Sequence, residues 1–539
     1  MVRPLVTIIL WQALLLLGLE SANASADPAG ALLQKSLQPQ LHRGSRLHVN
    51  VQQMPQGVAE FYAARQWAPV WDDARFAVLL KEIAGLDADG LNPEDYGLAA
   101  LKPYAHVGDD PVHQAQREKM ATRAYLLALV HLYRGKVDPV QVDPHWNFAM
   151  RPLDPEHGLT LAREAVENNK IDEMFQAARP SLPQYKALRA ALATLRQTAA
   201  SGGWPRIPAG PALKPGMSDA RVPVLRKRMA VPGMPAAAQT SGAPDLYDPQ
   251  LVGAVQRFQA DSYAETDGVL GPATVRALDI PVQRRIGQLR VNLERMRWIV
   301  GHLDQDYVLV DVAGYHVFYI HDNKPVWQAR IQIGKSYRQT PVFRSSITHV
   351  TLNPTWTVPP TIMRKDSLPA IRRSREYLSK NNIRVFDARG HERAPESVNW
   401  RHPGHITLRQ DAGPDNSLGQ LVLRFPNPYD VYMHDTPHKS LFDSTQRAFS
   451  SGCIRVQNVR DLAVILLADP VKWSKQALDT TLATNITSEV KLPKKIPVLI
   501  AYWTFDMDDS GYVSFKPDVY GEDPKILKAL DEHSTVAIP

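Results

Sequence analysis

Apolar and polar positions alternate with the period of an α-helix through residues 56–197. Within this block, Ala121 to Tyr133 is a mainly apolar stretch that Gly135 ends, a pattern typical of a buried helix. Residues that could perform catalysis do not cluster anywhere in the block. We therefore expect residues 56–197 to form a helical scaffold domain.

A second helical unit follows a stretch rich in proline and glycine. Residues 198–211 carry several of these residues and are predicted to be a linker. In residues 212–285, Asp248 supplies a helix N-cap and Pro249 suits the first helical position. A glycine-rich turn from Asp267 to Pro272 precedes a last short helix. This pattern predicts a small unit of three helices.

The period changes to that of β-strands after about residue 300. Runs of β-branched and aromatic residues are separated by turn residues, as expected for strands. The predicted strands are residues 307–312, 316–320, 329–333, 347–352, 421–425 and 431–433. We expect residues 300–485 to form a β-rich domain, interrupted at about residues 361–408 by a basic, helix-forming insertion. In the C-terminal extension, residues 490–539, the segments 497–505 and 512–515 are predicted to pair as a hairpin.

The first residues have the layout of a secretory signal peptide. Arg3 precedes an almost wholly apolar run from Leu5 to Leu19, and small residues around Ala24 follow. We expect residues 1–24 to be cleaved on export and residues 25–55 to be a flexible lead. A retained membrane anchor is the alternative, but the apolar run is short for a bilayer.

Composition narrows the possible partners and redox chemistry. Hydrophobic residues make up 44% of the 539 residues, enough to bury cores and to exclude a mostly disordered chain. The net charge of +7 is compatible with an anionic polymer but too dilute to indicate nucleic acid. A single cysteine forbids an internal disulfide and any metal site built from several cysteines.

That cysteine, Cys453, lies in the segment with the clearest chemical signal. His434 ends a predicted strand, and Cys453 precedes a predicted helix. Because a thiol with a pKa of about 8.5 is mostly protonated at neutral pH, an imidazole can activate it by taking the proton. Gly452 allows backbone N–H groups to approach a developing oxyanion. Arg455 supplies a positive charge that could hold a carboxylate, or pair with a local acid.

A metal site is the competing interpretation. His434 and His438 are four residues apart, a metal-ligand spacing on a helix. Pro437 argues against a helix there, and no glutamate follows His434 as in zinc proteases. We therefore expect neither a metal ion nor a cofactor.

The same residues resemble a known enzyme family. Cys453 follows His434 by 19 positions within Ser-Ser-Gly-Cys-Ile-Arg, and this pattern resembles the YkuD-type L,D-transpeptidases, particularly their YcbB-like branch. Ser451 stands where many members carry a second histidine. Further matches are residues 338–343, 353–359 and 415–419, while residues 254–259 and 267–274 resemble the three-helix peptidoglycan-binding domain.

The resemblance implies a multidomain α+β protein: a helical scaffold, a small three-helix peptidoglycan-binding domain and a β-rich catalytic domain with a helical capping insertion. It implies that Cys453 attacks a peptidoglycan tetrapeptide stem at its third residue, meso-diaminopimelate, and expels D-alanine. An amine of a second stem then resolves the acyl-enzyme into a 3→3 cross-link. Carbapenems would acylate the same cysteine.

The resemblance also assigns roles to individual residues. The catalytic residues would be Cys453, His434 and Gly452. The third catalytic member in the family is often a backbone carbonyl that orients the histidine, and Asp435 is the candidate for it here. The residues expected to bind substrate are Arg455, Ser451, Trp356, Tyr432 and Asn416. The protein would be a periplasmic monomer that binds stem peptides, and other cell-wall synthesis enzymes are possible partners.

Two other functions stay open on sequence alone. A non-catalytic wall-binding protein could retain the fold, although the presence of both Cys453 and His434 argues against a decayed site. An L,D-carboxypeptidase would use the same acyl-enzyme with water as the acceptor.

Overall fold

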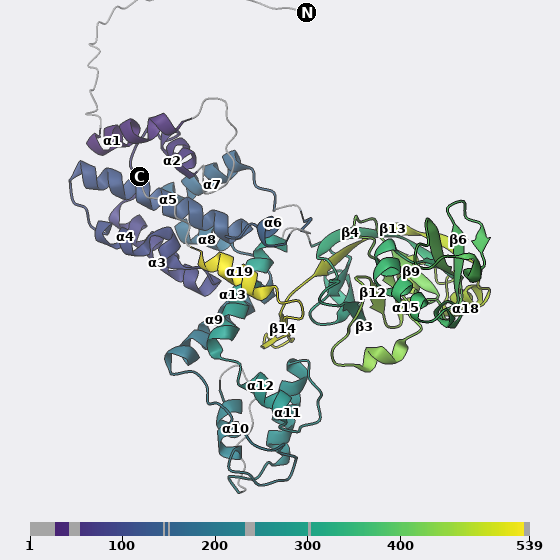
Figure 1. The fold of residues 1–539 in the computed structure, drawn as a ribbon. Helices are drawn as coiled ribbons and strands as arrows, with labels where there is room; N and C mark the ends of the chain where they lie inside the picture. The colour runs from purple at the N-terminus through teal and green to yellow at the C-terminus, as the bar shows by residue number, and fades with distance from the viewer. Residues whose placement is uncertain are drawn as a thin grey trace, which may run out of the picture.

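The computed structural model describes residues 27–41, 54–143, 146–148, 151–231, 243–299 and 303–532. The predicted signal peptide lies outside these ranges. Three lobes meet around helices α13 (Val282–Ile299) and α19 (Asp523–Asp531): a helical lobe, a small three-helix unit and a β-rich domain (Figure 1). Within the described ranges, no helix combines the length and apolar character needed to cross a membrane. The multidomain α+β fold class is confirmed.

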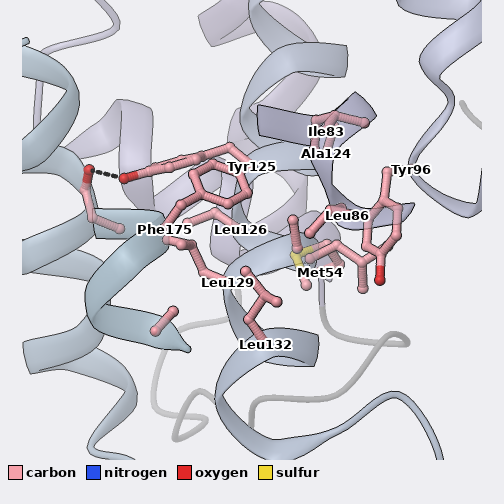
Figure 2. Packing of buried hydrophobic residues seen from close by; sticks show 14 of the residues in the cluster. Met54, Ile83, Leu86, Tyr96, Ala124, Tyr125, Leu126, Leu129, Leu132 and Phe175 are labelled. Carbon is pink, nitrogen blue, oxygen red and sulfur yellow. Dashed lines mark hydrogen bonds between the residues drawn. The ribbon is translucent and has the colours of Figure 1, made fainter. Parts of the chain in front are cut away.

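The helical lobe is built around one long helix. Its main helices are α2 (Met54–Ala63), α3 (Asp73–Gly85), α5 (Pro111–Arg134), α7 (Pro155–Glu167), α8 (Ile171–Ala178) and α9 (Pro183–Ala200), with short turns α4 (Leu98–Leu101) and α6 (Pro139–Val142). Tyr125, Leu129 and Leu132 of α5 are buried in one core with Phe175 of α8 and Met54 of α2 (Figure 2). The apolar stretch identified in the sequence is the C-terminal half of α5, which is buried along most of its length.

The prediction of a flexible lead is wrong for residues 27–41. They contain helix α1 (Pro28–Leu37), whose N-terminus is capped by the Asp27 carboxylate accepting a hydrogen bond from the Ala29 N–H at 3.1 Å. Leu33 and Leu37 are buried against the scaffold core. Their spacing of four residues places them on one helical face, and this contact outweighs the polar composition of the segment.

The three-helix prediction for the second unit is confirmed. Its helices are α10 (Val222–Met229), α11 (Pro249–Asp261) and α12 (Pro272–Leu278). The Asp248 carboxylate caps α11 by accepting from the Leu251 N–H at 2.9 Å. A separate core of Leu225, Met229, Val255 and Leu278 holds the unit together.

Helices α13 and α19 connect the lobes. In α13, Arg297 is fully buried and pairs with Glu294 at 2.7 Å, while Trp298 packs in the scaffold core. In α19, Ile526 and Leu530 are buried in the same core. The extension predicted to be only a hairpin therefore also ends in a helix that docks on the scaffold.

The β-rich domain is a curled sheet of nine strands in the order β11-β3-β12-β10-β9-β4-β13-β1-β2, with β2 pairing also with β3. The sheet therefore closes on itself. Its strands are β1 (Tyr307–Asp311), β2 (His316–His321), β3 (Lys324–Gly334), β4 (Phe343–Leu352), β9 (Leu421–Arg424), β10 (Met433–His434), β11 (Ala448–Ser450), β12 (Ile454–Val456) and β13 (Ser488–Ala501). Helices α17 (Val459–Leu467) and α18 (Lys475–Ala483) supply buried leucines to its core.

Strand β13 corrects the predicted C-terminal hairpin. It pairs antiparallel with β4 and parallel with β1, so it is a central strand of the sheet rather than part of an extension beyond residue 485. The hairpin is formed instead by β14 (Phe505–Met507) and β15 (Val513–Phe515). A local hairpin pattern could not reveal pairing with strands more than a hundred residues earlier.

The capping insertion is not purely helical, which corrects a second expectation. It contains a four-stranded sheet in the order β5-β8-β6-β7, formed by β5 (Trp356–Thr357), β8 (Ile406–Gln410), β6 (Ile383–Asp387) and β7 (Glu392–Arg393). Helices α14 (Pro360–Ile362), α15 (Leu368–Arg373) and α16 (Glu376–Lys380) accompany it, with a π-helical turn at Met363–Ser367. The cap has its own small core, which includes Leu368, Val385 and Leu408.

Candidate active site

His434 and Cys453 are brought together by two adjacent parallel strands. Residues Met433 and His434 of β10 pair with Ile454 and Arg455 of β12. The Ile454 N–H donates to the Tyr432 carbonyl at 3.0 Å. Because side chains alternate along a strand, His434 and Tyr432 share one face of the sheet with Arg455 and the adjoining Cys453.

The helix predicted after Cys453 is present as α17, which begins at Val459. Between the cysteine and this helix lies the short strand β12, which the sequence did not reveal. The buried stripe of α17 is as predicted, with Leu462, Ala463 and Leu466 in the core. The extra strand is what fixes Cys453 beside β10.

The imidazole of His434 is oriented by a main-chain carbonyl. Its Nδ1 lies 2.5 Å from the Asp435 carbonyl oxygen. A carbonyl can only accept, so Nδ1 carries the proton and Nε2 is the basic nitrogen. The Asp435 carboxylate turns elsewhere: it accepts from the Gln420 N–H at 3.2 Å and lies 3.6 Å from Lys439 Nζ. Asp435 thus orients His434 through its backbone and not through its side chain.

Burial keeps both groups neutral at rest, and the positive charge of Arg455 adds to this effect only at His434. Burial, with the positive charge of Arg455, lowers the pKa of His434 to about 3. Burial raises the pKa of the Cys453 thiol, and the opposing effects of Tyr432, Arg455 and Arg424 are smaller. The Cys453 Sγ donates a hydrogen bond to the Asp430 carbonyl at 3.6 Å rather than to His434. The resting site therefore holds a thiol and a neutral imidazole.

The loop before Cys453 is held by two hydroxyl groups that the sequence did not single out. Gly452 has a φ of +120°, a conformation that favours glycine. Its carbonyl accepts from the Thr340 hydroxyl at 2.8 Å. Its N–H donates to the Ser450 hydroxyl at 3.1 Å, which in turn donates to the Cys453 carbonyl at 2.5 Å. Position in the matched segment 338–343 was the only available signal for Thr340.

The residues expected to bind substrate fall into distinct environments. Arg455 donates to the Gln332 side chain at 3.2 Å, and within the part of the chain that the structure describes no acid pairs with it. The Tyr432 ring meets His434 edge-on at 5.7 Å between centroids. Ser451 is exposed and accepts from Arg338 at 2.9 Å. Trp356 begins β5, in the sheet of the cap, and is half-buried.

Asn416 does not match its expected role. It is 3% exposed, and its Nδ2 donates to the carbonyls of Pro354 and Asp411 at 3.1 and 2.9 Å. Its Oδ1 accepts from the Leu418 N–H at 2.8 Å. Both ends of the amide are used within the protein, so Asn416 shapes the loop before β9 instead of contacting a substrate.

A cavity of about 570 Å³ opens beside the Cys453 loop. Ser451 and Gly452 form part of its wall, together with the segment 336–342. Side chains of α13 and α19, among them Trp298 and Lys525, complete it. A large space lined by both aromatic and polar side chains can hold a ligand, and here it adjoins the two residues before Cys453.

Family models match three parts of the chain. Residues 305–472 match the "L,D-transpeptidase catalytic domain", residues 56–192 a "Scaffold domain" and residues 236–278 a "Putative peptidoglycan binding domain". The chain carries an L,D-transpeptidase catalytic domain. Cys453 and His434 both lie inside the matched residues 305–472.

A curated relative agrees with the family models. The chain is 31% identical over 242 residues to a "Putative L,D-transpeptidase" of Haemophilus influenzae, covering 44% of this chain and 48% of the relative. The chain thus spans about half the length of the curated relative that it matches. A solved L,D-transpeptidase from Xylanimonas cellulosilytica aligns with 14% identity over 55% of this chain and 99% of that structure, with a TM-score of 0.16. The assignment therefore rests on the family models and the curated relative.

Proposed function

We propose that this protein is a peptidoglycan L,D-transpeptidase that forms 3→3 cross-links through an acyl-enzyme on Cys453. The observation that carries the proposal is the parallel pairing of β10 and β12, which places the Cys453 thiol on the same face of the sheet as the imidazole of His434, whose Nδ1 carries the proton. The peptidoglycan-binding match supports the choice of polymer.

The proposed first half-reaction transfers an acyl group to sulfur. Sγ attacks the carbonyl carbon of the third stem residue while His434 Nε2 takes the thiol proton. The Gly452 N–H already donates to Ser450, so the neighbouring Cys453 N–H is the donor we assign to the oxyanion. The carbon–nitrogen bond to D-alanine then breaks, and the imidazolium returns its proton to the leaving amine.

In the second half-reaction an amine of another stem attacks the thioester. His434 takes a proton from that amine, the carbon–sulfur bond breaks and the thiol is restored. If water replaces the amine, the same steps describe a carboxypeptidase. We place the protein in the periplasm, where its polymer is exposed.

Two measurements test the proposal. Intact mass after exposure to a carbapenem is expected to show one adduct on the wild type and none on Cys453→Ala; an unmodified wild type would contradict a reactive Cys453. Muropeptide analysis of walls from cells that express the protein is then expected to show 3→3 dimers. Shortened tripeptide stems without dimers would identify a carboxypeptidase. If neither dimers nor shortened stems are found, the remaining interpretation is a wall-binding protein.

A further inference from the structure

Arg338 joins the loop of the proposed nucleophile to the cap. Its Nη1 donates to the Ser451 hydroxyl at 2.9 Å, two residues before Cys453. The same guanidinium makes a two-pronged contact with Asp366, with distances of 2.5 and 3.1 Å to the two carboxylate oxygens. Asp366 lies in the π-helical turn Met363–Ser367 of the cap. Such turns often occur at functional sites.

The two partners differ in how firmly they are held. Arg338 lies in a tight loop beside Gly334. A Cβ atom added at Gly334 would lie only 2.1 Å from the Arg338 carbonyl oxygen. The Arg338 side chain is 14% exposed, and its buried Nε has no hydrogen-bond partner among the described residues. The Asp366 side chain is 48% exposed. The arginine is thus fixed in place with an unused donor, while its carboxylate partner is open to exchange with solvent.

We propose that Arg338 binds a carboxylate of the donor stem peptide, and that Asp366 occupies this position only in the substrate-free protein. This inference rests on the proposed function, because it concerns how the same site selects its substrate. A planar guanidinium is suited to two-pronged recognition of a carboxylate. Substrate entry replaces Asp366 on Arg338 and at the same time releases the cap from the Ser451 loop.

Arg455 is less suited to this role. It donates to Gln332 and pairs with His434 in the strand register, and its charge acts on the pKa values of both His434 and Cys453. Arg338, by contrast, lines the cavity beside Ser451 and Gly452. Its position places a positive charge on the cavity wall, next to Ser451, rather than beside His434.

The test compares two reagents on the full chain. A carbapenem carries a carboxylate, whereas iodoacetamide is neutral, and intact mass gives the rate of modification of Cys453 by each. We expect Arg338→Gln to slow acylation by the carbapenem by about tenfold or more, since a charge-assisted bond is lost. Asp366→Asn, which removes the competing carboxylate, should accelerate it by about threefold or more. Neither variant should change alkylation by iodoacetamide more than about twofold, because the reagent has no carboxylate to bind.

Two further variants separate charge recognition from structure. Arg338→Lys keeps the charge without the planar fork and should fall between the wild type and Arg338→Gln. Arg384→Gln breaks a comparable exposed ion pair of the cap, with Glu392 and Asp411, and should leave both rates unchanged.

Specific outcomes would overturn the inference. If Asp366→Asn slows acylation as Arg338→Gln does, the Arg338–Asp366 ion pair serves only to hold the cap in position. If Arg338→Gln slows both reagents equally, the arginine acts on the thiol. If wild-type Cys453 reacts with iodoacetamide but not with the carbapenem, the proposed function itself fails, a result distinct from the other two.

Discussion

His434 and Arg455 occupy paired positions on the parallel strands β10 and β12. A permanent positive charge therefore accompanies the imidazole, and it contributes to lowering the pKa of His434. The same charge favours the thiolate form of Cys453, although burial still leaves the thiol pKa raised. Burial outweighs this charge at the thiol, so the site at rest holds a neutral thiol and a neutral imidazole.

The first prediction concerns the pH dependence of thiol reactivity. Because the Cys453 pKa is raised, the thiolate fraction and the alkylation rate should increase about tenfold per pH unit across the neutral range. Tyr432→Phe removes a hydrogen bond that lowers the thiol pKa, so its profile should move to higher pH. Arg455→Gln should move it in the same direction. Iodoacetamide alkylation followed by mass measures all three profiles.

A plateau at neutral pH in the wild type would contradict this prediction. It would mean that a thiolate–imidazolium pair already exists before substrate binds. Lys439→Gln is a matched control, since it removes an exposed positive charge near Asp435 that has no part in the pKa of Cys453.

The second prediction concerns Asp435, whose carboxylate does not touch His434. Asp435→Asn keeps an oxygen that can accept from the Gln420 N–H and leaves the main-chain carbonyl in place. We therefore expect carbapenem acylation to fall by less than about fivefold, because the tautomer of His434 is unchanged. His434→Gln should lower the rate by about a hundredfold or more, since the general base is lost. Equal losses in the two variants would assign catalysis to the carboxylate instead.

The sequence was sufficient to propose the reacting residues but not to predict the contacts around them. The proposal needs only the types and order of His434 and Cys453 and the glycine before the cysteine, all of which are visible in the sequence. That β10 and β12 pair in parallel depends on the surrounding sheet, which includes strands far away in the chain. For this reason β13 was predicted to be part of a hairpin.

The directions and contacts of individual side chains could not be predicted from the sequence either. Asp435 contacts His434 through its main-chain carbonyl, whereas the position of its carboxylate beside the Gln420 N–H could not be read from the sequence. Asn416 looked like a substrate ligand because it is polar and lies in a matched motif, whereas its amide satisfies buried carbonyls. Thr340 and Arg338 reach the Cys453 loop from more than a hundred residues away.

The third prediction concerns Thr340, which is 2% exposed and bonds to two backbone groups. Its hydroxyl accepts from the Gly334 N–H at 2.9 Å and donates to the Gly452 carbonyl. Thr340→Val keeps the shape but leaves both groups unpaired, which should cost about 1–3 kcal/mol of unfolding free energy. Acylation of Cys453 should slow as well, because the Gly452 loop loses its anchor.

Thr340→Ser is the matched control, since it retains the hydroxyl and loses only a methyl group. It should keep nearly all the activity that Thr340→Val loses. Denaturant unfolding measures the stability change, and the carbapenem rate measures the effect on the loop. If valine and serine behave alike in both measurements, the hydroxyl does not hold the loop.

The fourth prediction concerns the acid sensitivity of the helical lobe. His131 of α5 is 3% exposed, and its Nδ1 lies 2.9 Å from the Tyr96 hydroxyl. Burial, together with the charges of Lys136 and Arg297, lowers its pKa to about 3. In the unfolded chain the pKa of a histidine is about 6.5. Between this pH and about 3, His131 is therefore protonated in the unfolded state but neutral in the folded state. Stability should therefore fall as the pH drops from about 6.5 toward 3, by up to about 1.4 kcal/mol per pH unit from this group.

His131→Gln isolates this contribution, because glutamine fills a similar volume and does not titrate. At pH 7 the variant should be somewhat less stable than the wild type, since the bond to Tyr96 changes. Between pH 7 and pH 4.5 it should lose about 2–3 kcal/mol less than the wild type, as the linkage of one proton requires. His434 is also buried with a lowered pKa and remains in both proteins, so its contribution cancels in the comparison. Urea unfolding of the helical signal at the two pH values gives the difference; equal losses would mean that His131 takes up its proton without unfolding the lobe.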